Sequence, residues 1–101
     1  MTDKPYEPWH PIADPLDIKH LGKLLEEMGE CTQAASRCLI QGMSKTNLKE
    51  NQPNFRCLED EIADVLANIS LVIHHFHLDA KHIDERSSAK ITKLRTWHKM
   101  S

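Results

Sequence analysis

The sequence predicts an all-α protein, an antiparallel bundle of about three main helices. From residue 15 onward, apolar residues recur at spacings of three and four, the period of a helix buried along one face. No stretch shows the alternation of apolar and polar residues that is typical of a half-buried strand. The 101 residues are enough for one domain with a modest core of its own. We therefore expect the bundle to be completed by homo-oligomerisation, as a dimer or a tetramer.

Helices are predicted over residues 15–41, 55–77 and 80–99. Asp14-Pro15 matches an N-cap followed by a proline at the first helical position, and Gly42 is a suitable glycine to end that helix. Asp79 can cap the third helix, whose apolar stripe is thinner than the other two. The residues from 43 to 54 lack periodicity and are expected to form a loop.

The chain is expected to begin with an extended arm over residues 1–14, followed by a single helical domain over residues 15–101. Prolines at the density found in the arm prevent a helix and favour extended backbone. The prolines and the ring side chains between them are Pro5, Tyr6, Pro8, Trp9, His10 and Pro11.

Small residues inside the first two helices suggest that another helix approaches them closely. Gly22 and Gly29 lie seven residues apart on nearly the same face, and each costs about 1 kcal/mol relative to alanine in a helix interior. Ala63, Ala67 and Ser70 form a second face of small residues on the next helix. Because three helices offer too few neighbours to cover these faces, a second subunit is the expected neighbour.

Composition and charge exclude several classes of protein. The net charge of -2 gives no basic footprint, so nucleic acid is not an expected partner. No apolar run reaches the roughly 18 residues of a membrane span, and the first residues lack the order of a signal peptide. Cys31, Cys38 and Cys57 form no Cys-x-x-Cys pair, and their odd number favours buried, reduced thiols. These observations predict a cytoplasmic protein without a membrane partner.

Two pairs of carboxylates border the apolar stripes of the first two helices. Glu27 and Glu30 are three residues apart, and Glu61 and Asp64 repeat this spacing, so each pair projects from one face. Four such charges at a partly shielded helix seam repel one another strongly. A divalent cation resolves the repulsion, and oxygen ligands favour a hard ion such as Mg²⁺. The alternative interpretation is that these acids simply cover a solvated face.

The sequence context of the two pairs resembles the MazG-type all-α nucleoside triphosphate pyrophosphohydrolase family. That family has Glu-x-x-Glu on one helix and Glu-x-x-Asp on the next, separated by a loop. This chain has LLEEMGE at residues 24–30 and EIADVL at residues 61–66, with 30 residues between Glu30 and Glu61. The resemblance extends over about 85 residues, the three predicted helices, and implies the helical fold described above.

The resemblance also implies a reaction. The four carboxylates would hold Mg²⁺, with Mn²⁺ as an alternative, on the phosphates of a nucleoside triphosphate. Water would attack the α-phosphorus and release a nucleoside monophosphate and pyrophosphate, with a carboxylate accepting the proton. Glu27 lies nearest the core side of its pair and is favoured as the base. The preferred base and sugar of the substrate are not encoded in any motif.

Cations for the phosphates are predicted on two helices. The family commonly places basic residues where this chain has Lys90, Lys93 and Arg95, of which the two lysines share a face. Lys23 lies four residues before Glu27 and either pairs with that carboxylate or reaches a phosphate. Each of these side chains also fits an ordinary solvated helix surface.

Trp9 and Asn68 are the candidate residues of the nucleobase pocket. Trp9 belongs to the aromatic arm, which either stacks on a base or packs across an oligomer interface. Asn68 continues the polar seam that Glu61 and Asp64 begin on the second helix.

Two other classes of protein compete with this interpretation. A di-iron carboxylate bundle needs Glu-x-x-His on two helices, and neither His74 nor His75 has a carboxylate three residues before it. The run of histidines also includes His77 and His82, but no cysteine lies at the spacing of a zinc site. A non-catalytic helical interaction protein is the remaining alternative.

Overall fold

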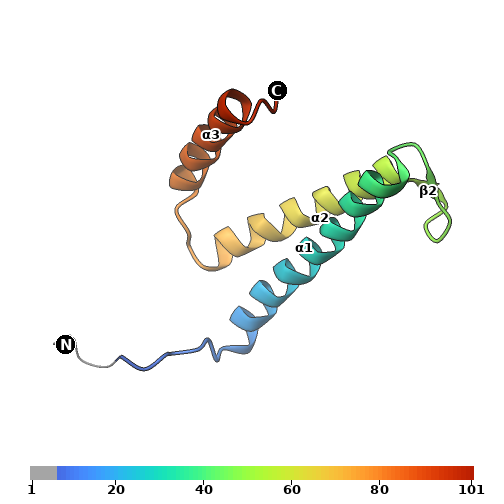
Figure 1. Cartoon of the computed structure of the whole chain (residues 1–101). Helices are drawn as coiled ribbons and strands as arrows, with labels where there is room; N and C mark the ends of the chain where they lie inside the picture. The colour runs from blue at the N-terminus through green and yellow to red at the C-terminus, as the bar shows by residue number, and fades with distance from the viewer. Residues whose placement is uncertain (1–6) are drawn as a thin grey trace, which may run out of the picture.

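The chain forms an antiparallel helical hairpin followed by a third helix that stands apart from it (Figure 1). The computed structural model describes residues 7–101. The helices are α1 (Pro15–Gln41), α2 (Asn54–His75) and α3 (Ala80–Trp97), which confirms the all-α prediction and agrees with the predicted ends to within two residues. In the arm, the described residues 7–14 are exposed and form no helix or strand, while Tyr6 and Pro5 lie outside the described part.

Local capping fixes where α1 and α3 begin. The Asp14 carboxylate accepts hydrogen bonds from the backbone N–H groups of Leu16 at 3.1 Å and Asp17 at 3.0 Å. Asp79 accepts in the same way from the N–H of His82 at 3.0 Å. These carboxylates satisfy donors that have no partner within the helix, so the predicted caps are confirmed.

Gly42 ends α1 because its backbone adopts a φ of 102°, which a side chain would strain. Its N–H donates to the carbonyl of Cys38 at 2.9 Å and closes the last turn. The predicted C-terminal glycine is therefore confirmed.

The segment between α1 and α2 is more ordered than the sequence indicates. It contains β1 (Thr46–Asn47) and β2 (Gln52–Pro53), which pair antiparallel with Thr46 opposite Pro53 and Asn47 opposite Gln52. The expectation of an irregular loop without strands is wrong here, because strands of two residues are too short to show alternation. The Asn47 side chain accepts from the N–H groups of Lys49 at 2.9 Å and Glu50 at 3.2 Å, which stabilises the turn.

Polar contacts join α1 to α2 at both ends of the hairpin. At the loop end, the buried Asn54 donates from its amide to the Gln41 side chain at 3.2 Å and the Gly42 carbonyl at 3.0 Å. At the open end, His75 Nε2 lies 2.6 Å from Asp17 Oδ1, and the ring stacks on His20. These contacts set the register between the helices.

The apolar core between α1 and α2 is small. Its buried side chains are Ala34, Cys38, Cys57 and Val72. The three cysteines are free thiols, and Cys31 is only half-buried. A core of this size leaves most of the apolar side chains of the hairpin at its surface.

α3 adds no buried residue to this core and does not pack along the hairpin. The polar stretch Arg86-Ser87-Ser88 interrupts its apolar stripe, which explains why it makes little contact. Within residues 7–101, nothing lies within 4 Å of a Cβ atom built at Gly22 or Gly29, so no helix of this part of the chain makes the close approach expected at these glycines. No helix in residues 7–101 is both long enough and apolar enough to cross a membrane.

The Asn54 amide offers a direct test of this fold. We expect Asn54→Ala to lower the free energy of unfolding by about 1–3 kcal/mol, because it leaves partners of a buried amide unsatisfied. Urea unfolding followed by circular dichroism measures the change. Ser87→Ala, an exposed truncation on α3, is the control and should stay within about 0.5 kcal/mol of the parent. Equal stabilities of the two variants would contradict this role for Asn54.

Candidate metal centre

Carboxylates from both helices of the hairpin meet at the seam between them. Glu27 comes from α1, and Glu61 and Asp64 come from one face of α2. One carboxylate oxygen from each of the three lies within 4.8 Å of the others. The structure therefore brings together three of the four predicted acids, and we call them the carboxylate cluster.

Glu30, the fourth predicted acid, lies next to the carboxylate cluster without belonging to it. Its side chain is exposed and lines a cavity that Glu61 also lines. The charge of Glu30 raises the pKa of both Glu27 and Glu61 after the larger effect of burial. Glu30 is thus close enough to interact with the cluster electrostatically.

Two oxygens of the carboxylate cluster are buried without a partner. Glu27 is only 9% exposed, and its Oε2 and the Oε2 of Glu61 accept no hydrogen bond within the described chain. A buried carboxylate oxygen without a donor is costly. A proton, a water molecule or a cation would satisfy these oxygens.

The electrostatics of the carboxylate cluster favour binding of positive charge. Burial raises the pKa of Glu27, and the charges of Glu30 and Asp64 add to this effect while Lys23 opposes it. Burial also raises the pKa of Glu61, followed by the charges of Glu30, Asp64 and Glu27. A divalent cation would remove the repulsion that these shifts reflect.

The donor set fits Mg²⁺. All the possible ligand atoms are carboxylate oxygens, which hard divalent cations prefer, and Glu27 and Glu61 each have a buried oxygen without a partner in the described chain. Mn²⁺ accepts the same ligands.

Lys23 neighbours the carboxylate cluster as an ion-pair partner. Its Nζ lies 3.3 Å from Glu26 Oε1 and 3.6 Å from Glu27 Oε1. The hydrogen bond and the charge of Glu26 raise the pKa of Lys23. Of the two roles expected for Lys23, the structure shows the pairing with Glu27.

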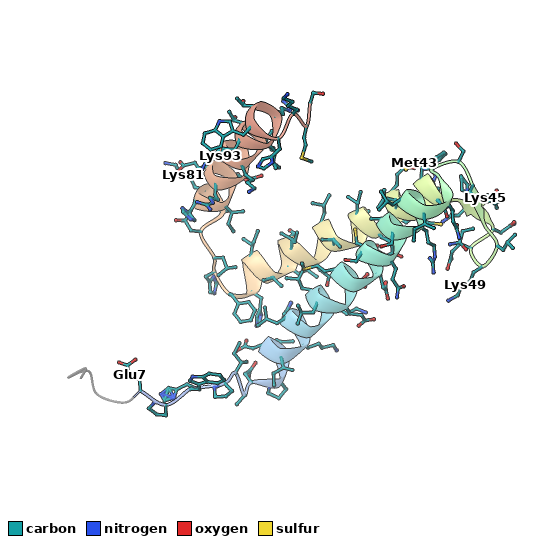
Figure 2. The ribbon with its side chains drawn as sticks, viewed as in Figure 1. Glu7, Met43, Lys45, Lys49, Lys81 and Lys93 are labelled. Atoms are coloured by element: carbon teal, nitrogen blue, oxygen red, sulfur yellow. The ribbon has the colours of Figure 1, made fainter. Side chains whose placement is uncertain are left out.

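The cations predicted on α3 are not close to the carboxylate cluster within one chain. Lys90, Lys93 and Arg95 are exposed, and α3 does not pack along the hairpin. Figure 2 shows Lys93 on α3, well apart from α1 and α2. A phosphate held by the cluster of the same chain would therefore lie beyond their reach in this arrangement.

The two predicted base-pocket residues are placed very differently. Trp9 is 92% exposed on the arm. Asn68 is half-buried, and its amide donates to the Asp64 carbonyl at 2.8 Å. It also lines a cavity of about 240 Å³ together with Leu16, His20 and Leu71, while Lys23 stands at the side nearest the carboxylate cluster.

Arg37 and Lys49 are candidate site residues that the sequence interpretation missed. Both line a cavity of about 270 Å³ together with Glu30 and Glu61. Arg37 lies two helical turns after Glu30 and so on the same face of α1, a signal that was available in the sequence. Lys49 lies in the turn between β1 and β2, where no periodicity marks its position.

Histidines take no part in the carboxylate cluster. The cluster is the one group of three possible metal ligands found in residues 7–101, and it consists of carboxylates alone. His75 lies instead at the open end of the hairpin beside Asp17. The carboxylate cluster therefore offers only carboxylate oxygens as ligands.

Comparison of the chain with protein-family models, curated proteins and solved structures finds no significant match. The resemblance to the MazG-type family stays a prediction that rests on the two acidic motifs.

The stability of the metal-free protein should depend on pH through the carboxylate cluster. The pKa values of Glu27 and Glu61 are raised above the ordinary 4.5, so the folded chain binds protons more tightly than the unfolded chain. The stability that comes from this tighter proton binding is fully present below about pH 4.5. It is lost as the pH rises from there through the raised pKa values of the two groups. We expect Glu27→Gln to lose less stability over this range and to raise the metal-free Tm at neutral pH by a few degrees.

Thermal unfolding with and without Mg²⁺ measures both effects. Mg²⁺ should raise the Tm of the parent protein more than that of Glu27→Gln, because a ligand stabilises the state that binds it. Glu85→Gln, an exposed change on α3, should behave like the parent. An equal response of all three proteins to pH and Mg²⁺ would show that the cluster does not bind the cation.

Proposed function

We propose that the protein is a Mg²⁺-dependent nucleoside triphosphate pyrophosphohydrolase, with Mn²⁺ as an alternative ion. The observation that carries the proposal is the meeting of Glu27, Glu61 and Asp64 at a helix seam, with buried oxygens that lack partners. The order and spacing of the acidic motifs, which resemble the MazG-type family, supply the reaction. The substrate is a ribo- or deoxyribonucleoside triphosphate.

In the proposed reaction, the oxygen of a water molecule bonds to the α-phosphorus as the bond from that phosphorus to the α–β bridging oxygen breaks. The bridging oxygen leaves with pyrophosphate, and a nucleoside monophosphate remains. When bound, Mg²⁺ neutralises phosphate charge. Glu27 is the proposed acceptor of the proton from water, because burial raises its pKa and so strengthens its carboxylate as a base. Glu61 and Asp64 would hold the cation together with Glu27, and Glu30 would complete the acidic set from the solvent side.

The cavity beside Asn68 is the proposed position of the nucleobase. Leu16 and Leu71 give it apolar walls, and His20 offers a ring for stacking. The Asn68 amide can offer a donor and an acceptor to a base edge. Trp9 joins this pocket only if the arm folds over the hairpin or reaches it from another subunit.

Exposed apolar stripes support the proposal of a homo-oligomer. The surface area of the chain is 8813 Å², whereas a compact monomer of this mass would expose about 5,800 Å². Leu25, Met28 and Leu39 lie on one face of α1, because Met28 follows Leu25 by three residues and Leu39 follows Met28 by eleven, about three helical turns; Leu39 is 88% exposed. On α2, Ile62, Leu66 and Ile69 form a similar exposed stripe. A second copy would cover these stripes, and α3 of another subunit could bring Lys90, Lys93 or Arg95 to the phosphates.

The same stripes favour a second candidate function, a non-catalytic helical interaction protein. An amphipathic helix of a partner could occupy an exposed apolar face of the hairpin. This candidate gives no role to the carboxylate cluster, and a measurement of nucleotide hydrolysis separates the two functions.

The three free thiols agree with the proposed cytoplasmic location.

Hydrolysis of nucleotides tests the proposed function. A panel of nucleoside and deoxynucleoside triphosphates with Mg²⁺ or Mn²⁺ should include a substrate that yields monophosphate and pyrophosphate in equal amounts. Glu61→Gln should lower the rate by roughly a hundredfold or more, since it removes a charged ligand of the cation. Glu59→Gln, an exposed neighbour on α2, is the matched control and should keep the parent rate. Absence of activity on every nucleotide, or full activity in Glu61→Gln, would exclude the proposal.

Light scattering coupled to gel filtration tests the oligomer. The expected mass is that of a dimer or a tetramer of the 11.6 kDa chain. Leu39→Glu should shift the equilibrium toward smaller species, because it places a charge in the apolar stripe of α1. Leu48→Glu is the control, since Leu48 is equally exposed but lies in the loop. A parent protein that stays monomeric at every concentration would contradict the oligomer.

A further inference from the structure

The cavity beside the carboxylate cluster contains cations that the proposed reaction has not yet used. It measures about 270 Å³, and Arg37 and Lys49 line it together with Glu30 and Glu61. Arg37 is half-buried on α1, and Lys49 is exposed in the turn between β1 and β2. Figure 2 shows Lys49 at the loop end of the hairpin, where α1 ends and α2 begins. Two cations from different elements thus line the same cavity as two of the predicted acids.

Neither cation forms an ion pair within residues 7–101, in contrast to Lys23. Glu50 and Asp60 also line the cavity, so that four carboxylates surround it together with Glu30 and Glu61. The Oδ2 of Asp60 accepts a hydrogen bond from the Gln52 amide at 3.1 Å. The two cations therefore have their donors free for an anion.

The turn that carries Lys49 is held in place by buried polar contacts. Asn47 is 7% exposed, and its side chain accepts from the N–H groups of Lys49 and Glu50. The pairing of β1 with β2 closes this turn over the end of the hairpin. The backbone at Lys49 is therefore already ordered, and less conformational entropy of the turn is lost when Lys49 binds a ligand.

The lining of the cavity, whose volume is about 270 Å³, matches a chain of phosphates better than a nucleobase. Its lining is mostly charged or amide-bearing, and only Ala34 and Cys57 are apolar. A planar base would find no apolar wall here, whereas phosphate oxygens would find a guanidinium and an ammonium.

We infer that this cavity binds the β- and γ-phosphates of the substrate, which become the pyrophosphate product, through Arg37 and Lys49. The inference rests on the proposed function and extends it by assigning the leaving-group side of the site. Along the hairpin, the cavity of Asn68, the carboxylate cluster and the cavity of Arg37 follow one another in that order. The order gives the substrate a direction, with its base toward the open end and its terminal phosphate toward the loop.

The two cations would also assist the reaction. Negative charge moves onto the bridging oxygen of pyrophosphate as its bond to the α-phosphorus breaks. Positive groups placed where this charge develops stabilise the transition state more than the ground state. Because four acidic residues line the cavity, namely Glu30, Glu50, Asp60 and Glu61, pyrophosphate should bind well only when Mg²⁺ is present.

Titration calorimetry of pyrophosphate into the full chain with Mg²⁺ tests the inference. We expect binding to the parent protein, and an affinity lower by about tenfold or more in Arg37→Ala and in Lys49→Ala, because each loses a charged contact to phosphate. Arg37→Lys keeps the charge without the planar fork and should fall between the parent and Arg37→Ala. Arg86→Ala and Lys81→Ala remove the same kinds of charge from α3 and should bind as the parent does. Figure 2 shows Lys81 on α3.

The outcomes separate this inference from the proposed function. Equal pyrophosphate affinities in the parent, Arg37→Ala and Lys49→Ala, or no binding to the parent, would overturn the inference even if Glu61-dependent hydrolysis is found. Weaker pyrophosphate binding in both cavity variants but not in the α3 controls would support it, even if no nucleotide is hydrolysed. Lys49→Ala changes an exposed side chain and keeps the test decisive if Arg37→Ala unfolds the chain.

Discussion

Packing of α1 against α2 forces carboxylate oxygens of Glu27 and Glu61 into a seam where no donor of the described chain reaches them. The helices cannot separate to solvate these oxygens without losing the few buried side chains of the core. Burial and mutual repulsion therefore raise the pKa of both groups. A bound divalent cation would turn this unfavourable arrangement into a stabilising one, since the attraction acts where water is largely excluded. On this account, the stability of the hairpin depends directly on the binding of a metal.

The hairpin positions this cluster through contacts at its ends more than through its core. Asn54 joins the two helices beside the loop, and Asp17 with His75 joins them at the open end. Between these points, the helices need only small side chains to pack closely, as Ala34 shows. Because so few side chains are buried between the helices, the surface of the hairpin is rich in apolar residues. A second copy that covers this surface would stabilise the hairpin and could place its own α3 near the substrate.

Local signals allowed the helices and the three members of the carboxylate cluster to be predicted from the sequence. Asp14 and Gly42 mark the ends of α1 through contacts with their own neighbours in the chain. The spacing of Glu61 and Asp64 places them on one face whatever the rest of the fold does. The position of α3 could not be predicted, because its thin stripe does not specify which surface it meets. Lys49 was missed because the turn that presents it depends on pairing between β1 and β2, which leaves no periodic pattern.

The binding of a divalent cation by the carboxylate cluster is the central claim, and electron paramagnetic resonance of Mn²⁺ tests it most directly. Titration of Mn²⁺ into the full chain should show a saturable loss of the signal of the free ion. Competition by Mg²⁺ should restore that signal. Asp64→Asn should weaken Mn²⁺ binding about tenfold or more, since it removes one charged ligand, whereas Asp84→Asn on α3 should leave it unchanged. A free-ion signal that does not fall on addition of the protein, or equal binding by both variants, would contradict the account.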